Sequence, residues 1–271
     1  MSRLNNNATG LGAQGSGRGW VGRAGGAPGR AGLGLALAAA LGACGPGHGT
    51  DCLKSTGPVV TERRAVAPGL VTVKAFDNVD LRLVQDVETY AEVRAGQNLL
   101  SDIELRRAGN ALEIVNTSAC NWARSYDTPR EVTLHLPRIR NVFLSGQGNV
   151  GTVGQFAQDT LFCHLVGAGD LDLNLQARYL NVDQYELGDM TLRGSADELL
   201  FTLGGAGRLF AQGLSLRRCY FRTTRDSDGD VRVRATDVVS GTVAGNGTFF
   251  YGGRPTQVSI RVTGKGRQQA E

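Results

Sequence analysis

The sequence predicts an all-β fold, a parallel β-helix or solenoid with coils of about twenty residues. Two observations predict it: glycine units recur at a nearly constant spacing, and apolar residues alternate with polar residues around them. The last glycines of successive units are 21, 19, 19, 22, 18 and 19 residues apart. A repeat of this length is typical of stacked units that bury one continuous core. These glycines are Gly148, Gly169, Gly188, Gly207, Gly229, Gly247 and Gly266.

The residues beside each glycine unit predict strands with one buried face, because every second residue is apolar. Cys163-His-Leu165 precedes one unit, and Leu171-Asp-Leu173 follows it. The glycines are therefore interpreted as turns, where a positive φ or the close contact of neighbouring coils requires Gly. They do not resemble phosphate-binding loops, because no predicted helix follows any of them.

The segment before the repeats, residues 68–138, has the same alternation in a less regular form, for example in 79–83 and 112–114. We therefore expect its strands to share the core of the repeats, without a linker between the two parts. The chain has 39 glycines but no Gly-x-y period, which excludes a collagen-like triple helix.

Residues 1–43 are predicted to be a lipoprotein signal peptide. Their apolar run, 31–43, is too short to span a bilayer but suits the core of a signal peptide. It ends in Leu41-Gly-Ala-Cys44, which resembles the bacterial lipobox, a motif whose Cys is lipidated and becomes the first residue. The predicted partner is therefore a membrane, reached through acyl chains on Cys44. We expect an outer-membrane lipoprotein of the cell envelope, with residues 44–64 as a flexible tether.

The charge of the chain argues against a nucleic-acid partner. The formal net charge of +4 includes four arginines within the first 43 residues, which contain no acidic residue. Without that segment the chain is nearly neutral, whereas a nucleic-acid-binding protein needs a basic face. The four arginines are Arg3, Arg18, Arg23 and Arg30.

Four segments carry a family resemblance: Phe76-Asp-Asn-Val79, 98–103, 132–137 and Phe143-Leu-Ser-Gly-Gln-Gly-Asn-Val150. Together they resemble the head-GIN domain family, which is labelled "putative auto-transporter adhesin". The resemblance covers residues 65–266 and leaves 267–271 as a C-terminal tail. It implies a single-stranded, right-handed β-helix carried on an envelope lipoprotein. It implies no catalytic residues, because the family has none established.

A short acidic segment, Asp226-Ser-Asp-Gly-Asp230, looks like a calcium-binding loop because Asp226, Asp228 and Asp230 alternate in a tight turn. An EF-hand would also need a later Glu and flanking helices, and the sequence predicts neither. A turn with an inserted residue is the favoured interpretation. We therefore expect no metal and no cofactor.

The function predicted from these observations is a non-enzymatic envelope lipoprotein that presents a β-helix for binding, adhesion or scaffolding, with a glycan or a surface protein as the candidate ligand. The alternative is a glycan-active enzyme of the polysaccharide-lyase kind. A lyase needs acidic and basic groups on one face, and four arginines precede Asp226 and Asp228 closely. Solvated outward strand positions are the favoured interpretation of those arginines, since a fold alone does not imply chemistry. They are Arg217, Arg218, Arg222 and Arg225.

The residues that follow the glycines are expected to form one exposed column if the coils stack in register, about 4.8 Å apart. Arg208 would then lie between Asp189 and Asp230 and relieve the repulsion between carboxylates. The expected column is Asn149, Asp170, Asp189, Arg208, Asp230, Thr248 and Arg267.

The cysteines after Cys44 permit only some disulfides. Cys163 and Cys219 are three coils apart, roughly 14 Å at strand spacing, which is too far for a disulfide. We therefore expect both as buried thiols. Cys52 and Cys120 lie in irregular segments before the repeats, and we expect a disulfide between them, in an exported protein, that covers the open end of the solenoid.

Overall fold

The structure is a computed structural model that describes residues 55–118 and 128–271. Almost all of these residues lie in strands, with one short 3-10 helix, η3 (Gln97–Asp102). The strands before the glycine repeats are β1 (Val59–Ala65), β2 (Thr72–Asp77), β3 (Asp80–Gln85), β4 (Tyr90–Gly96), β5 (Ile103–Ala108), β6 (Ala111–Asn116) and β7 (Arg130–Leu136). The later strands are β8 (Asn141–Gly146), β9 (Val150–Val153), β10 (Phe156–Gly167), β11 (Leu171–Glu186), β12 (Met190–Leu203), β13 (Leu209–Thr223), β14 (Val231–Val243), β15 (Thr248–Gly252), β16 (Gln257–Val262) and β17 (Arg267–Ala270).

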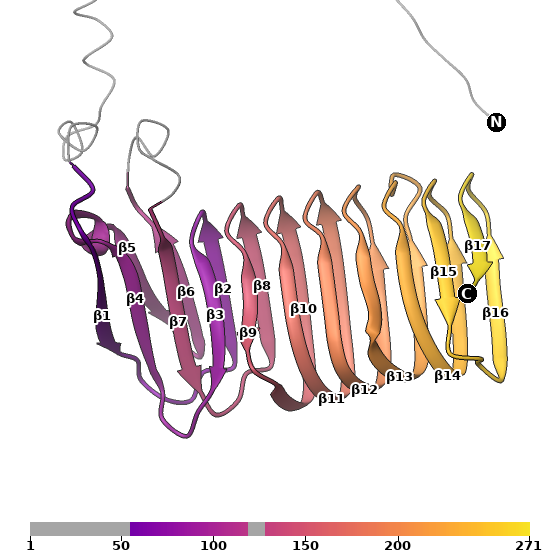
Figure 1. Ribbon diagram of the computed structural model, residues 1–271, viewed down its shortest axis with the longest axis horizontal. Helices are drawn as coiled ribbons and strands as arrows, with labels where there is room; N and C mark the ends of the chain where they lie inside the picture. The colour runs from indigo at the N-terminus through magenta and orange to yellow at the C-terminus, as the bar shows by residue number, and fades with distance from the viewer. Residues whose placement is uncertain (1–54, 119–127) are drawn as a thin grey trace, which may run out of the picture. The chain divides into compact units, whose positions relative to one another are not determined.

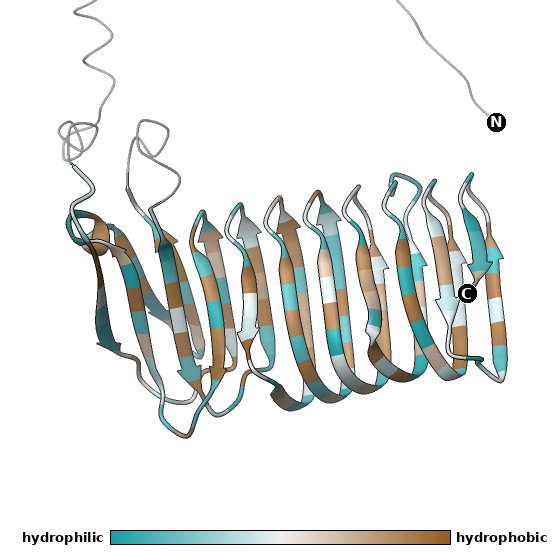
Figure 2. Ribbon diagram, in the orientation of Figure 1, coloured by the Kyte–Doolittle hydropathy of each residue, from teal (hydrophilic) through white to brown (hydrophobic). Residues whose placement is uncertain are grey.

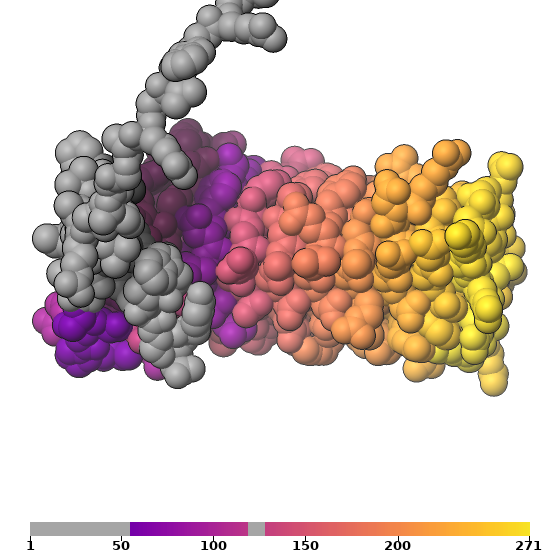
Figure 3. All heavy atoms as spheres, turned by 90° about the horizontal axis from the view of Figure 1, so that it is seen from above, coloured from indigo at the N-terminus to yellow at the C-terminus, as the bar shows by residue number. Residues whose placement is uncertain are grey.

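The strands wind into a β-solenoid of about six turns, which confirms the predicted fold class. Each of the long strands β10 to β14 bends halfway along its length and pairs in parallel with the next (Figure 1). Seen from above, successive coils follow one another as bands of colour from pink to yellow (Figure 3). The expected stacking of repeats in register is therefore correct, apart from bulges between β12, β13 and β14.

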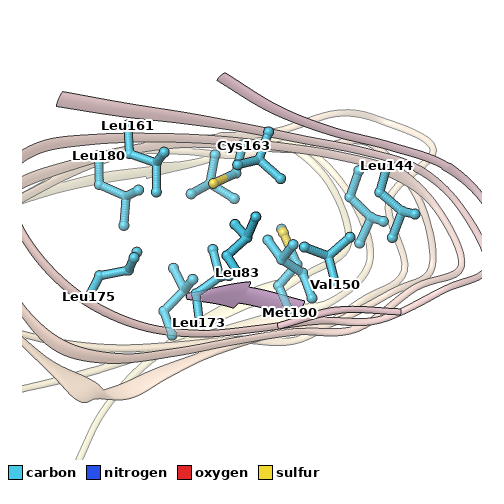
Figure 4. Close-up of a cluster of buried hydrophobic side chains, with 14 of the residues drawn as sticks. Leu83, Leu144, Val150, Leu161, Cys163, Leu173, Leu175, Leu180 and Met190 are labelled. Carbon is cyan, nitrogen blue, oxygen red and sulfur yellow. The ribbon is translucent and has the colours of Figure 1, made fainter. Parts of the chain in front are cut away.

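The core is the space enclosed by the coils, as the alternation in the sequence predicts. Inward side chains such as Leu83, Leu144 and Leu173 meet between the two walls of the solenoid (Figure 4). Coloured by hydropathy, the strands show apolar and polar residues in alternation (Figure 2). Farther along, Phe221 and Phe249 stack with ring centroids 3.8 Å apart. Buried residues from the segment before the glycine repeats and from the repeats themselves belong to one hydrophobic cluster, so the expected shared core is confirmed.

The order of coils at the N-terminal end differs from the order of the sequence. The coil formed by β2 and β3 lies between β6–β7 on one side and β8–β9 on the other. After β3, the chain first forms the coil that contains β6 and β7, at the N-terminal end of the stack. It then returns to form β8 and β9 on the other side of β2 and β3, where the regular coils follow (Figure 1).

Antiparallel pairs also occur at this end, where sequence analysis predicted parallel coils. β4 pairs antiparallel with β1 and β7, and β5 pairs antiparallel with β6. The prediction of parallel coils was wrong for these strands. β5 and β6 form a hairpin, because the chain reverses directly between them, whereas β4 pairs with two strands that are distant from it in the sequence. These strands and η3 cover the end of the stack, which a solenoid must protect.

The strands extend beyond both expected limits of the domain. Residues 59–64 were expected in the tether, but they belong to β1, which pairs with β4. Residues 267–271 were expected as a tail, but β17 pairs in parallel with β15. Both corrections have the same physical reason: a short strand with few apolar residues is stabilised by the backbone hydrogen bonds of its neighbour.

The repeated glycines are required by the close approach of neighbouring coils. A Cβ atom on Gly169 would lie 1.8 Å from the carbonyl oxygen of Gly148, and one on Gly229 would lie 1.8 Å from that of Gly207. None of these four glycines has a positive φ. At these four positions close contact is therefore the reason that applies, whereas Gly146 and Gly167, two residues earlier in the first two turns, have positive φ values of 147° and 153°.

The predicted column after the glycines is present and is held by side-chain oxygens. Asn149 Oδ1 accepts a hydrogen bond from the backbone N–H of Asp170 at 2.9 Å, and Asp170 Oδ1 accepts one from Asp189 at 2.9 Å. Asp189 continues the series by accepting from the N–H of Arg208 at 2.8 Å. The column begins one coil earlier than predicted, since Asp80 Oδ1 accepts from Asn149 at 2.7 Å.

Arg208 has the neighbours that sequence analysis gave it. Its Nη2 lies 2.7 Å from Asp189 Oδ2. The hydrogen bond that Arg208 donates to Asp189 and the charges of Asp189, Asp230 and Asp170 raise the pKa of Arg208 above its usual value. Farther on, Asp230 Oδ1 accepts a hydrogen bond from the N–H of Thr248 at 2.7 Å.

The column makes a testable prediction about the acceptor atom. Asp170→Ala removes the acceptor for the N–H of Asp189, so the free energy of unfolding should fall by about 1 kcal/mol. Asp170→Asn keeps an Oδ1 in the same place and should stay close to the wild type. Urea denaturation of the three proteins measures this difference. An Asn variant as unstable as the Ala variant would show that the charge, and not the acceptor, matters.

The two buried thiols make a second prediction. Cys163 and Cys219 are free and fully buried. They belong to two different rows of stacked core side chains. Burial raises the pKa of Cys163 to about 12 and raises that of Cys219 as well. Because the thiolate is the reactive form, neither should react with iodoacetamide at pH 8 until the protein is unfolded in urea.

The control for the thiol experiment is Ser259→Cys, which places a thiol at an exposed position of β16. Peptide mapping after labelling distinguishes the sites. If Cys163 or Cys219 in the folded protein reacted as fast as this control thiol, the described core would be wrong.

Candidate functional site

A groove runs along the edge of the solenoid where strands β10 to β14 bend, opposite the glycine turns (Figure 1). Its volume is about 750 Å³, and it crosses five successive coils. Strands β10 to β13 each contribute three residues from the same part of the strand, so the lining repeats from coil to coil, and β14 contributes Thr236 alone. A representative coil supplies Ser195, Ala196 and Asp197.

Small side chains create the hollow. Ala157, Ser195 and Ser215 are exposed and lie in one row, because Gln176 and Ser195 are paired and Ser195 and Ser215 are paired. The adjacent row contains Ala177 and the buried Ala196, with Gln158 and the buried Leu216 on either side of them. Apart from the exposed Gln176, the middle coils therefore bend over small side chains.

One wall of the groove is a row of charges that alternate in sign: Asp159, Arg178, Asp197, Arg217 and Asp237. Arg178 Nη2 lies 3.0 Å from Asp159 Oδ2, and Arg217 Nε lies 3.0 Å from Asp237 Oδ2. Four of the five charges are therefore paired across the gaps between coils, and Asp197 leaves the row with one net negative charge.

These pairs determine the protonation of the wall. The hydrogen bond from Arg178 lowers the pKa of Asp159, and hydrogen bonds from Thr236 and Arg217 lower the pKa of Asp237. Both carboxylates are therefore ionised at neutral pH. A general acid needs a raised pKa, so neither group suits the proton donor of a glycosidase-type reaction.

The groove continues beyond β10 towards the N-terminal coils. Gln158 and Asp159 also line a second hollow of about 470 Å³, together with residues 69–71 and 138–140. Gly69, Leu70 and Arg138 in turn line a third hollow of about 280 Å³ with residues 87, 89, 136 and 137. Because neighbouring hollows share lining residues, they lie next to one another along the edge of the solenoid.

The structure does not assemble the arginine and aspartate cluster that a lyase would use. Arg217 pairs with Asp237, and Arg218 Nε lies 3.0 Å from Glu198 Oε2, both near the bend. Arg222 is five residues farther along β13, roughly 16 Å at strand rise, and Arg225 lies in the turn that follows. The four arginines are solvated outward or turn positions, the interpretation that sequence analysis favoured.

The three aspartates of the calcium-like segment also have separate roles. Asp226 is exposed, and Asp228 Oδ1 accepts a hydrogen bond from Asn246 Nδ2 at 2.6 Å. Asp230 belongs to the column described above. Within residues 55–118 and 128–271, no three His, Cys, Asp or Glu side chains gather in a way that could hold a metal ion.

The predicted lipidation and disulfide sites lie outside the described residues. These sites are Cys44, for the acyl chains, and Cys52 with Cys120, for the disulfide. In the described part of the chain, no helix is long and apolar enough to cross a membrane.

Sequence analysis missed the groove, although a signal for it was present. The five charged residues of the wall are 19, 19, 20 and 20 residues apart, the same period as the glycines. Aligning the repeats and reading every column, instead of only the one after the glycines, would have shown the alternation of sign. The hollow itself leaves a weaker signal, a run of Ala and Ser at one position.

Fold and groove together define a β-solenoid with a long surface groove. The chain belongs to the family described as "Putative auto-transporter adhesin, head GIN domain", whose sequence pattern matches residues 70–255. The resemblance found in the sequence is thereby confirmed. None of the curated proteins compared with the chain matches it.

Three solved structures share the fold. The structure titled as a putative adhesin from Bacteroides fragilis NCTC 9343 has a TM-score of 0.71 at 21% identity, and the match covers 79% of this chain and 97% of that chain. One titled as a putative lipid binding protein from Parabacteroides distasonis ATCC 8503 has a TM-score of 0.61 at 17% identity, with the same coverage. An adhesin-titled structure from Parabacteroides merdae ATCC 43184 reaches 0.52 at 18% identity, again covering 79% and 97%. At these identities the likeness concerns the fold alone.

Proposed function

We propose that this chain is a non-enzymatic, adhesin-like lipoprotein of the cell envelope, and that the groove along its edge is the binding surface. The observation that carries the proposal is the continuous groove across successive coils. Most of its charged wall is already paired, as in Arg178 with Asp159, so the wall offers polar contacts that repeat from coil to coil. Its adhesin-like character agrees with the family to which the chain belongs.

The proposed anchor is the set of acyl chains on Cys44. Fourteen residues, 45–58, separate this Cys from the first strand, and they begin with the glycine-rich run 45–49. A tether of this kind would let the solenoid present its groove away from the membrane surface. Two or three acyl chains would hold the protein stably, whereas one would not.

The first test concerns the groove. Ser195→Trp places an indole in the row of small, exposed side chains and should fill the hollow without disturbing the core. We expect at least a tenfold loss of binding to isolated cell-surface material, measured by co-sedimentation. Ser259→Trp makes the same change at an exposed position outside the groove and should bind as the wild type does.

The outcome that contradicts this proposal is specific. If the Ser195→Trp protein has a wild-type thermal transition and still binds envelope material with wild-type affinity, the groove is not the binding surface.

A second test concerns the anchor. Cys44→Ser removes the thiol that would accept the lipid, so the protein should become unprocessed or should leave the membrane fraction. Metabolic labelling with a fatty acid, followed by fractionation, measures both effects. A Cys44→Ser protein that stays with the membranes in processed form would mean that another anchor exists.

A further inference from the structure

Two arginines in the groove differ from all the others that line it. Arg138 and Arg140 lie in the turn between β7 and β8, on either side of the buried Ile139. Because residues alternate in direction here, both arginine side chains are exposed on the same side. They line the second hollow of the groove.

Neither of these arginines has an ion pair within the described part of the chain, whereas Arg178 and Arg217 farther along the groove are both paired. Arg140 instead lies over the ring of Phe162, with its guanidinium carbon 5.6 Å from the ring centroid. The acidic side chain that lines this hollow, Asp159, is held by Arg178. Arg138 and Arg140 therefore bring two positive charges without an ion-pair partner in the described part of the chain to one end of a groove whose wall carries one net negative charge at Asp197.

The chemistry of this hollow selects the kind of ligand. A guanidinium offers a fork of donors that fits a carboxylate or a sulfate in a bidentate way. Beneath the two arginines the floor is apolar, because Leu70 and Ile139 are both buried there. The site thus combines anion recognition with an apolar surface, which suits a ring that carries an acidic substituent.

The length of the groove indicates a polymer. Beyond the arginines the path continues across the coils of β10 to β14, one step of roughly 4.8 Å per coil. A single small anion would use only the arginine end. A chain of similar units could use the repeated polar wall as well.

The lining indicates a glycan instead of a protein segment. Strands β11, β12 and β13 are paired on both sides, so no strand edge is open in the groove for an added strand. The lining is made of short and charged side chains, without the deep aromatic pocket that anchors a protein partner.

We propose that the groove binds an anionic polysaccharide, whose acidic groups lie against Arg138 and Arg140 while its following units lie along the paired wall. This inference rests on the proposed function and names its ligand class. The proposed function requires only that the groove is the binding surface. The arginine pair decides which polymers are bound.

The experiment compares three polymers by isothermal titration: polygalacturonate with carboxylates, dextran sulfate with sulfates, and neutral dextran. The full chain should bind one or both anionic polymers at least tenfold more tightly than dextran. Arg138→Ala with Arg140→Ala should abolish that preference. Arg138→Lys with Arg140→Lys should retain part of it, since the charges remain without the fork.

The matched control is Arg222→Ala with Arg225→Ala, which removes two exposed arginines from the opposite, glycine-turn edge. The affinity of this control for the anionic polymers should stay within about twofold of the wild-type affinity. The salt dependence of its binding should stay within the same range. An equal loss in both double variants would mean that only the overall charge matters, which would overturn the proposal.

The two proposals fail in different ways. If Ser195→Trp abolishes binding to cell-surface material while the Arg138 and Arg140 variant binds polymers and envelope material as the wild type does, the groove stands and the anionic ligand is wrong. If Ser195→Trp also has no effect, the groove itself is wrong.

Discussion

The close approach of neighbouring coils at the glycine turns is the constraint on which the rest of the structure depends. At Gly169 and Gly229 the carbonyl oxygen of the preceding coil occupies the space that a Cβ would need. Any larger residue would push the coils apart and break the parallel register that the strands share. Since the register repeats in every coil, each outward position becomes a column of neighbours about one strand spacing apart. Both polar features of the surface, the turn column and the groove wall, follow from this stacking.

Because the coils stack in register, a side chain on one coil lies beside the side chain at the equivalent position of the next coil and interacts with it. At the glycine edge, Asn149 and Asp170 use their side-chain oxygens to accept backbone hydrogen bonds from the next coil. At the opposite edge, acidic and basic residues alternate, so that like charges do not lie directly opposite one another. The first arrangement satisfies backbone donors at a turn, where the strand ladder ends. The second leaves a wall of alternating charges along a hollow, with two positive charges at Arg138 and Arg140 near one end.

The N-terminal coils show that a solenoid can grow in an order other than that of its sequence. The coil of β2 and β3 has neighbours on both sides that come later in the chain. The parallel pairing of β8 with β10 places Arg138 and Arg140 beside the start of β10, and the coil of β2 and β3 adds residues 69–71 to the same hollow. The same rearrangement closes the end of the stack with antiparallel strands. The site therefore depends on the irregular coils as much as on the regular ones.

The sequence by itself determined the solenoid, the family, the inward rows and the turn column, because each of these repeats with a fixed period or alternation. Sequence periodicity also placed Cys163 and Cys219 in the core, on different coils. The order of the N-terminal coils, the extra strands β1 and β17 and the groove were decided only by the tertiary structure. Pairing between distant segments leaves no local pattern, since any exposed strand edge can accept many partners. A hollow likewise depends on which small side chains become neighbours once the chain has bent.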